Sequence, residues 1–213
     1  AQAIAAMAYG TRTVPRVDKI VGPGNRWVSA AKSIVSADCA IDFYAGPTEI
    51  LIVAATTPPA WVAADLIAQA EHDPDARAVC ITTSRRVAEA IATEVALQMP
   101  KDGPAAASLW KHDGIIVAKN AGEAVGLANE AASEHLVVET DEMAARITNA
   151  GAVFVGPWTA QVAGDYALGS NHVLPTAGAA RFRGGLNAAD FVKLVSVQRV
   201  TERGLRRIAG TVT

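Results

Sequence analysis

Short apolar runs alternate along this chain with longer segments that are alanine-rich or apolar on one face only. Runs of four to six residues with few charges predict buried strands, because a strand inside a parallel sheet is covered on both faces. The segments between them have helical spacing. The predicted strands cover residues 17–21, 39–43, 50–55, 79–83, 114–118, 136–139 and 152–155. The predicted helices cover residues 1–9, 26–35, 58–71, 84–97, 121–132 and 141–149.

Strands that alternate with helices of this length indicate βαβ units. We therefore predict an α/β, Rossmann-like fold with a mostly parallel sheet and helices on both faces. In such sheets ligands bind beyond the carboxyl ends of the strands, where the strand order reverses, so we expect the functional residues at that edge. Residues 100–107 are predicted to form a flexible loop, residues 191–200 a helix and then a strand, and residues 202–209 a terminal helix.

The sequence opens directly in a helical pattern, and its first residue is Ala1 rather than methionine. We therefore expect this sequence to be a piece of a longer protein. Three parts are predicted. Residues 1–35 are the tail end of one incomplete α/β domain, residues 36–185 form the main α/β domain with the candidate site, and residues 186–213 start a truncated C-terminal helical region.

Composition and charge narrow the classes of partner. The formal net charge of −2 indicates neither nucleic acid nor an anionic membrane surface as a partner. No apolar run has the length of a membrane span. Cys39 and Cys80 lie singly in apolar runs without metal-ligand spacing, which indicates buried thiols in a reducing compartment and hence a cytoplasmic protein.

The most distinctive stretch of the chain is residues 164–176, GDYALGSNHVLPT. It is too polar and too rich in glycine for a core strand, and its apolar residues lack helical spacing. We therefore predict a shaped loop of the kind that carries function. Asp165 is a candidate metal ligand. His172 either binds substrate or ties the loop to backbone carbonyl groups.

Two further clusters combine histidine with other polar groups. Gln69 and His72 lie three residues apart at a predicted helix end, so they share a face and suit zinc, although a plain polar helix end has the same pattern. Glu134 and His135 are adjacent at a predicted strand start, where their side chains should point to opposite faces. This pair suits general acid–base chemistry, and an ordinary helix-to-strand turn is the alternative.

Two turns offer smaller binding groups. Residues 22–25, GPGN, lie between a predicted strand and a helix, which suits a phosphate or ribose at the helix N-terminus. They lack the full spacing of a dinucleotide fingerprint, so a tight turn explains them equally well. Thr48 ends the turn at residues 45–48 and serves either as a hydroxyl donor or as a cap.

Taken together and in this order, these motifs resemble one family, the histidinol dehydrogenases. The matching stretches are AQAIAAMAYGT, KIVGPGN, AGPTEILIVA, DLIAQAEHDP, SEHLVV and AGDYALGSNHVLPTAGAARFRGGL. They extend over nearly the whole chain, and several of them are highly specific. Members of the family are longer, and this chain resembles their middle and later portion.

The resemblance implies a role for each candidate residue. Positions that match zinc ligands are Gln69, His72 and Asp165; the catalytic pair is Glu134 and His135; NAD contacts are Gln2 and Asn25; and substrate contacts are Thr48, Gln69, His72, His135, Asp165 and His172. The implied activity is zinc-dependent, NAD-linked oxidation of L-histidinol, a small amino alcohol, to L-histidine through L-histidinal, in histidine biosynthesis. The implied assembly is a homodimer with a shared active site.

Three features depart from the family pattern. In the family the fourth zinc ligand is a histidine from the C-terminal tail of the partner subunit, which also brings a substrate-binding glutamate, and this sequence ends at Thr213 before such residues. Gln161 stands where the family commonly has glutamate, and Thr48 where it has serine. Two alternatives therefore stay open. One is a paralogous NAD-dependent dehydrogenase of another polar alcohol or a sulfonated diol, and the other is a catalytically incomplete fragment.

Overall fold

The structure is a computed structural model that describes residues 1–44, 46–112 and 114–212. Ala45, in the predicted turn before Thr48, lies outside the described residues. The elements in chain order are α1 Gln2–Tyr9, β1 Lys19–Ile20, α2 Arg26–Val35, β2 Ala40–Ile41, β3 Glu49–Val53, α3 Pro59–Ala70, β4 Arg77–Thr82, α4 Arg85–Gln98, α5 Pro104–His112, β5 Gly114–Val117, α6 Ala121–Ala131, β6 His135–Val138, α7 Asp141–Ala144, β7 Ala152–Val155, α8 Gln161–Tyr166, the short 3-10 helices η1 Ala179–Arg181 and η2 Ala188–Phe191, and α9 Glu202–Val212.

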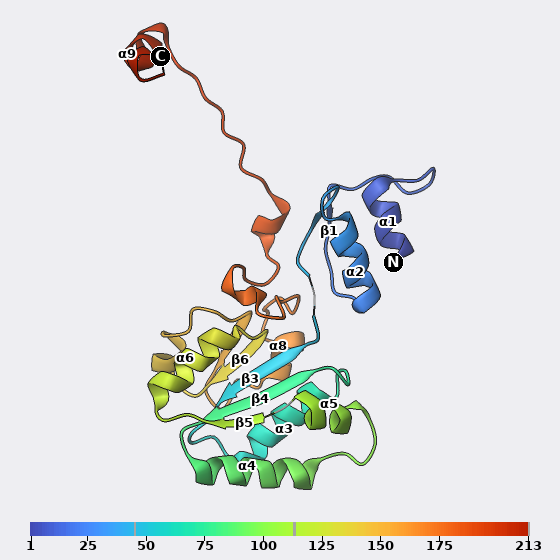
Figure 1. Cartoon of the computed structure of the whole chain (residues 1–213), viewed down its shortest axis with the longest axis vertical. Coiled ribbons are helices and arrows are strands. Elements are labelled where there is room, and N and C mark those ends of the chain that lie inside the picture. Colours follow the sequence, from blue (N-terminus) through green and yellow to red (C-terminus); the bar gives the residue numbers. More distant parts are fainter. Residues whose placement is uncertain (45, 113, 213) are drawn as a thin grey trace.

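The larger part of the protein is organised around one parallel sheet with the strand order β5-β4-β3-β6-β7. Within this sheet the chain forms the central strand β3 first, then β4 and β5 on one side of it, and finally β6 and β7 on the other side (Figure 1). This order is that of a doubly wound fold, and it reverses between β3 and β6. The predicted α/β fold is therefore confirmed.

Helices cover both faces of this sheet because β3, with the sequence EILIV, is buried along its whole length. Ile50 and Ile52 pack on one face against the helices α3 and α4, while Leu51 and Val53 pack on the other face against α6. Alternate residues of a strand point to opposite faces, so an unbroken apolar strand requires a cover on each side. Prolines at the start of α3 and a serine cap at Ser84 before α4 set where these helices begin.

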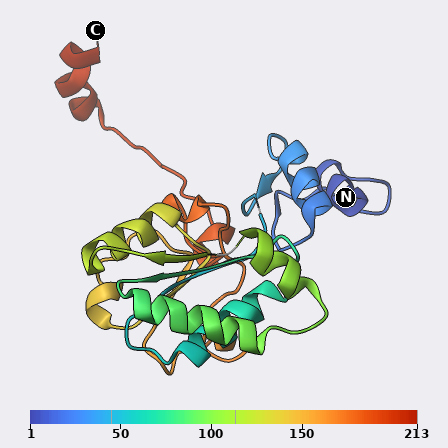
Figure 2. The ribbon, with the colours of Figure 1, turned by 60° about the horizontal axis from the view of Figure 1, so that its bottom comes forward.

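A smaller N-terminal unit, made of α1, β1, α2 and β2, lies beside the sheet (Figure 2). Its strands β1 and β2 pair in parallel. Its core contains Ile4, Ala8, Ile20, Val35 and Cys39. Because β2 follows residue 35 and pairs with β1, the unit as folded here continues to Ile41. The domain boundary near residue 35 stays a prediction about the whole protein.

The structure corrects three local predictions. Residues 104–107 of the predicted loop belong instead to the helix α5, which begins at Pro104, a residue well suited to the first turn of a helix. Asp165 and Tyr166 of the predicted loop end the helix α8. Residues 192–200 form neither the predicted helix nor a strand, because no described strand pairs with this apolar run.

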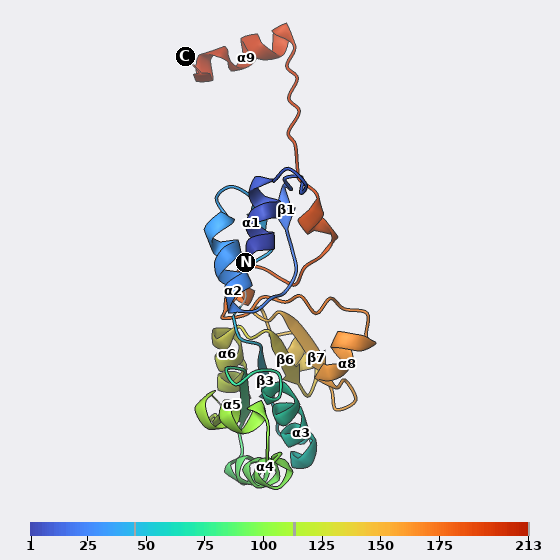
Figure 3. The ribbon, with the colours of Figure 1, turned by 90° about the vertical axis from the view of Figure 1, so that its right-hand side faces the viewer.

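The predicted terminal helix is confirmed as α9. Together with the extended residues 192–201 it forms a C-terminal arm, residues 192–212, that stands away from the sheet and from the N-terminal unit (Figures 1 and 3). None of the helices described in this structure is long and apolar enough to cross a membrane.

Candidate active site

The predicted catalytic pair lies at the amino ends of β3 and β6, the two strands between which the strand order reverses. His135 is the first residue of β6, and Glu134 directly precedes it. Ile50 of β3 is in register with His135, so Glu49 and Thr48 lie beside the pair. Glu134 and His135 are 7% and 5% exposed, which makes this a desolvated site.

The imidazole of His135 is held in one tautomer. Its Nδ1 lies 3.1 Å from the backbone carbonyl oxygen of Glu49, and a carbonyl only accepts, so Nδ1 carries the proton. Nε2 then keeps a free lone pair, and this buried atom has no hydrogen-bond partner among the described residues. Burial lowers the pKa of His135, so the neutral imidazole is favoured. These are the properties of a general base.

Glu134 has the opposite perturbation. Burial raises the pKa of its carboxyl group to about 7, against hydrogen bonds from Thr48 and from the backbone of Glu49 that lower it, while the charges of Glu49 and Asp165 raise it further. The Thr48 hydroxyl donates to Glu134 Oε2 at 2.6 Å, and the Glu49 N–H donates to the same oxygen at 3.0 Å. A carboxyl group with this pKa exchanges protons near neutral pH.

The sequence pattern predicted that the side chains of Glu134 and His135 point to opposite faces, but in the structure they lie together. Glu134 Oε2 lies 3.6 Å from His135 Nδ1. The reason is that β6 begins at His135, so Glu134 stands outside the alternation of the strand. Phe154 of β7 lies on another side of the imidazole, with 6.1 Å between the ring centroids.

The predicted zinc ligands come from α3 and α8. Gln69 is fully buried near the end of α3 and donates from Nε2 to the Thr48 hydroxyl at 2.7 Å, which leaves its carboxamide oxygen without a hydrogen bond to any described residue. His72 follows α3, and its charge and that of Asp165 both influence the pKa of His135, which places both near the imidazole. One carboxamide oxygen, one imidazole and one carboxylate suit zinc. The described residues contain no cluster of three His, Cys, Asp or Glu side chains that could hold a metal ion. Of the three predicted ligands only His72 and Asp165 are of these residue types, because the third is a glutamine.

The approach of α8 to this site depends on Gly164. A Cβ atom at this position would lie 2.6 Å from Cε1 of Phe154, inside van der Waals contact. The missing side chain lets α8 pack closely on the ring that lies beside His135. Asp165, the next residue, is thereby carried on a helix rather than on the predicted loop.

Only some of the predicted cofactor and substrate residues line the same cavity. Asn25 and Thr48 both line a cavity of about 370 Å³, together with Trp27, Asp73 and other residues of the same turns. Asn25 also caps α2, since its side chain accepts from the N–H groups at the helix start. Gln2 is exposed on the first turn of α1 and does not line this cavity. His172 is exposed, and neither a hydrogen bond nor an ion pair joins its side chain to the described residues.

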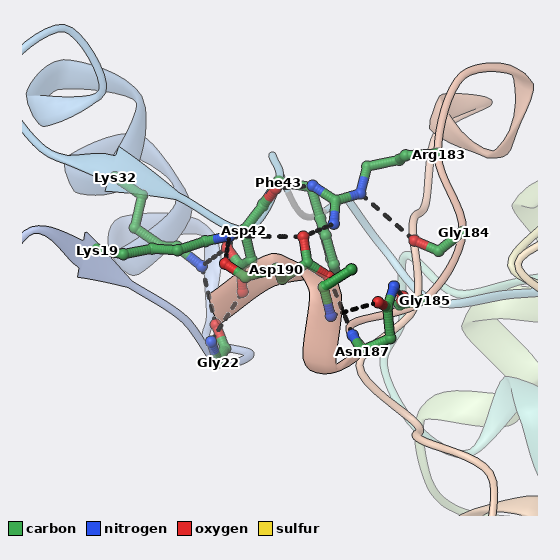
Figure 4. A network of polar contacts seen from close by, with 11 residues as sticks. Lys19, Gly22, Lys32, Asp42, Phe43, Arg183, Gly184, Gly185, Asn187 and Asp190 are labelled. Atoms are coloured by element: carbon green, nitrogen blue, oxygen red, sulfur yellow. Dashed lines mark hydrogen bonds and ion pairs between the residues drawn. The ribbon is translucent and has the colours of Figure 1, made fainter. Parts of the chain in front are cut away.

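Two buried charges fix the loop that carries Asn25 (Figure 4). Lys32 of α2 forms an ion pair with Asp42, and both are 3% exposed. Lys32 Nζ also donates to the Gly22 carbonyl at 2.9 Å, and the Gly22 N–H donates to Asp42 Oδ2 at 2.8 Å. Gly22 has a φ of +118°, which a residue with a side chain rarely adopts. The start of the 22–25 loop is therefore held by its backbone.

The same network joins the N-terminal unit to the segment before the C-terminal arm. Arg183 donates to the backbone carbonyl of Asp42 and stacks over the ring of Phe43 at 4.8 Å (Figure 4). Asp190 lies 3.2 Å from Arg183 and 3.4 Å from Lys19. Residues far apart in the sequence thus meet around one carboxylate.

At the carboxyl ends of β3 and β6, where we expected the functional residues, lies a cavity of about 240 Å³ whose lining includes Thr57, Glu139 and Gly156. Glu139 follows β6, and its carboxylate accepts from the backbone N–H groups of Ala55, Thr56 and Thr57 at 2.6–2.8 Å. Burial opposes ionisation, but these hydrogen bonds outweigh it and lower the pKa of Glu139. The helix α3, which follows residues 55–57, begins at Pro59 after the capping residue Pro58, and these prolines have no N–H to offer a phosphate. The candidate pair Glu134 and His135 lies instead at the amino end of β6, so the expected edge is not the one that carries this pair.

Sequence reasoning missed two kinds of residue here. Glu49 was assigned to no role, and its only signal was an acidic residue at the start of an otherwise apolar strand. Lys32 and Asp42 gave no signal, because charged residues in a helix and after a short strand are usually exposed. Their partners lie in other elements, which the sequence pattern does not pair.

The fold and the site together define a doubly wound α/β protein whose central strands carry a buried glutamate–histidine pair at their amino ends. The sequence profile of the histidinol dehydrogenases matches residues 1–213 of this chain. The chain belongs to this family.

Individual relatives agree with that assignment. The histidinol dehydrogenase of Halobacterium salinarum is 48% identical over 221 residues, which cover 100% of this chain and 52% of the relative. That of Bradyrhizobium diazoefficiens is 48% identical and covers 98% and 50%. The crystal structure of histidinol dehydrogenase from Elizabethkingia anophelis superposes with a TM-score of 0.90 and 39% identity, over 99% of this chain and 50% of that chain. The chain spans about half the length of the curated relatives it matches.

Proposed function

We propose that this chain supplies the catalytic pair of a zinc-dependent, NAD-linked dehydrogenase that oxidises L-histidinol to L-histidine through L-histidinal, in histidine biosynthesis. The observation that carries the proposal is the unpartnered, buried Nε2 of His135 beside Glu134, whose pKa is raised to about 7. Membership of the histidinol dehydrogenase family supports the choice of substrate.

Gln69, His72 and Asp165 would hold the zinc ion. Zinc bound there would grip the imidazole and amino groups of the substrate and so fix its orientation. Gln69 is itself fixed by its hydrogen bond to Thr48, so its carboxamide oxygen is oriented before binding. Thr48 joins this ligand to Glu134, which ties the substrate position to the catalytic pair.

Two oxidations at one carbon require two proton acceptors, and the pair supplies both. NAD would accept a hydride in each step. His135 takes the alcohol proton on Nε2, because Nδ1 already carries a proton held by the Glu49 carbonyl. Glu134 takes a proton from the water that attacks the aldehyde, since its carboxyl group is substantially ionised at a pH above about 7. His172 is assigned to the substrate pocket on the family resemblance alone.

NAD is proposed to contact Asn25 and Gln2. The cavity shared by Asn25 and Thr48 supports this, because a cofactor bound at Asn25 would adjoin the substrate at Thr48. At the carboxyl edge the N–H groups of residues 55–57 already donate to Glu139, so they are not free for a pyrophosphate, which also supports the proposal.

A second copy of this chain is the proposed partner, with an active site shared between subunits. The C-terminal arm supports this, because apolar side chains line it while it contacts neither the sheet nor the N-terminal unit (Figure 3). Leu194 is fully exposed, and Val197 is 88% exposed. Burial of such a surface against a partner is favourable at about 25 cal/mol per Å². The molar mass measured by light scattering as the protein elutes from a size-exclusion column tests this. The mass of a monomer at all concentrations would contradict it.

We place the protein in the cytoplasm. Cys39 and Cys80 are free buried thiols, which agrees with a reducing compartment. Burial raises the pKa of the Cys80 thiol to about 12, so it stays protonated and unreactive.

One observation favours a second candidate, a dehydrogenase of another polar alcohol. Gln161 is buried at the start of α8, one helical turn before Asp165, where the family commonly has glutamate. A neutral carboxamide there attracts a cationic amino alcohol less than a carboxylate does. An uncharged or sulfonated diol is then the better substrate.

NADH formation by purified protein of verified mass, with zinc and L-histidinol, tests the proposal. We expect two NADH per histidinol consumed, and none from His135→Asn. NADH from a diol but not from histidinol would identify the second candidate. No NADH with either substrate, from protein that is folded, would show a catalytically incomplete fragment and contradict the proposed activity.

A further inference from the structure

One buried carboxylate at the site has no part in the proposed chemistry. Glu49, the first residue of β3, is 9% exposed and stands between the catalytic pair and the turn at residues 176–178. Burying a carboxylate is costly unless it is hydrogen-bonded, so its partners indicate what it is for.

Glu49 contacts the catalytic pair through its backbone and its side chain. Its carbonyl oxygen accepts from His135 Nδ1 at 3.1 Å, and its N–H donates to Glu134 Oε2 at 3.0 Å. In return, the backbone N–H of Glu134 lies near enough to the Glu49 carboxylate to lower the pKa of Glu49, against the burial that raises it. The two glutamates therefore interact in both directions, each through its backbone with the other side chain.

The same carboxylate holds the turn that ends the polar segment after α8. The N–H of Ala177 donates to it at 3.1 Å, and the neighbouring N–H of Gly178 helps to lower the pKa of Glu49. Ala177 has a φ of +53° and Gly178 a φ of +77°. The left-handed conformation is strained for alanine, so it persists only where the surroundings compensate. Beside this turn, the Thr176 hydroxyl accepts from the Gly46 N–H at 2.5 Å.

We propose that Glu49 is a positioning residue that locks Glu134 and His135 to the end of the segment carrying Asp165 and His172. The inference rests on the proposed function for its kinetic consequence, but not for its geometry. Without the Glu49 carboxylate, the left-handed turn loses the acceptor of the Ala177 N–H and the backbone of Glu134 loses a neighbouring charge, so the pair is free to shift. A shift of about 1 Å in a catalytic group costs up to about 100-fold in rate.

Glu49 also acts on Glu134 through its charge. The groups that face the two carboxylates are Arg77 beside Glu49, Asp165 beside Glu134, and the neighbouring His135. The negative charge of Glu49 raises the pKa of Glu134. Removing that charge therefore lowers it, a change that a purely structural role would not produce.

Glu49→Gln, which keeps the size and one acceptor, is the test, and Glu139→Gln is the matched control. Glu139 is likewise a glutamate that accepts from several backbone N–H groups, but at the opposite end of β6. The titration of the Glu134 carboxyl carbon is followed by ¹³C NMR, with the signal assigned from Glu134→Gln. We expect a lower pKa for Glu134 in Glu49→Gln and the wild-type value in Glu139→Gln.

Steady-state kinetics give a second readout. Glu49→Gln should lower kcat at least about tenfold and leave the KM for NAD within about twofold, because Glu49 does not line the cavity that Asn25 lines. Glu49→Asp should restore part of the rate. An unchanged pKa of Glu134, or the same kinetic loss in Glu139→Gln, would overturn the proposal. If the wild-type protein forms no NADH, the proposed function fails while the NMR comparison still decides the role of Glu49.

Discussion

Replacing Lys32 by methionine removes one charge from the buried ion pair that fixes the 22–25 loop (Figure 4). Asp42 is then left buried without a cation, and breaking such a pair costs about 3–5 kcal/mol. Asp42 keeps two backbone hydrogen bonds, from Gly22 at 2.8 Å and from Phe43 at 2.7 Å. We therefore expect the lower end of that range, about 3 kcal/mol, or about 150-fold in the ratio of folded to unfolded protein.

Urea unfolding at neutral pH, followed by circular dichroism and tryptophan fluorescence, measures this loss. Lys119→Met is the control, because Lys119 precedes α6 and its partner Glu123 lies 3.8 Å away in an exposed pair at the start of that helix. Such pairs contribute about 0.5 kcal/mol or less. A loss below about 1 kcal/mol in Lys32→Met would refute the reasoning, since it would mean that the pair is not desolvated.

The double variant Lys32→Met/Asp42→Asn separates the charge effect from lost packing. Replacing both partners of a buried pair removes the uncompensated charge, so the double variant should be less destabilised than the sum of the single ones. We expect a coupling energy of about 2 kcal/mol. Strict additivity would show that the two side chains act independently.

Three other outcomes are expected. His135→Asn should abolish alcohol oxidation but keep zinc content near that of the wild type, and zinc loss would instead make His135 a ligand. Glu134→Gln should slow oxidation of added L-histidinal more than that of histidinol. It should also remove a pH dependence of the free energy of unfolding. The pKa of Glu134 rises from 4.5 to about 7 on folding, so its contribution is complete below pH 4.5 and lost as the pH rises through 7. Gly164→Ala should cost about 1–3 kcal/mol by urea unfolding and weaken zinc binding, because its Cβ would press on Phe154; wild-type stability would show that α8 moves freely.

Much of the fold is readable from the sequence because it depends on local pattern. The apolar run at 50–53 predicts a buried strand, and the asparagine at 25 and the serine at 84 predict helix starts that the structure confirms. Predictions failed where a pattern needed a partner. The apolar residues 192–200 are typical of a strand, but a strand forms only where another strand pairs with it.

The candidate site divides in the same way. Its residue types are visible as short motifs, and the family resemblance assigned their roles, which stay predictions until they are tested. Their placement was not visible. Glu134 lies beside His135, and not on the opposite face, because β6 begins at His135 and Glu134 stands outside the alternation of the strand.

The sequence by itself determined the alternation of strands and helices, and with it the α/β class, because periodicity and burial are properties of neighbouring residues. The tertiary structure alone decided that the candidate pair, Glu134 and His135, lies at the amino edge of the sheet and that Glu139 binds the backbone of residues 55–57 at the other edge. It also brought Glu49 to Glu134, 85 residues away along the chain. The pKa of Glu134 and the tautomer of His135 follow from that contact and from burial, since both depend on groups that only the pairing of β3 with β6 brings together.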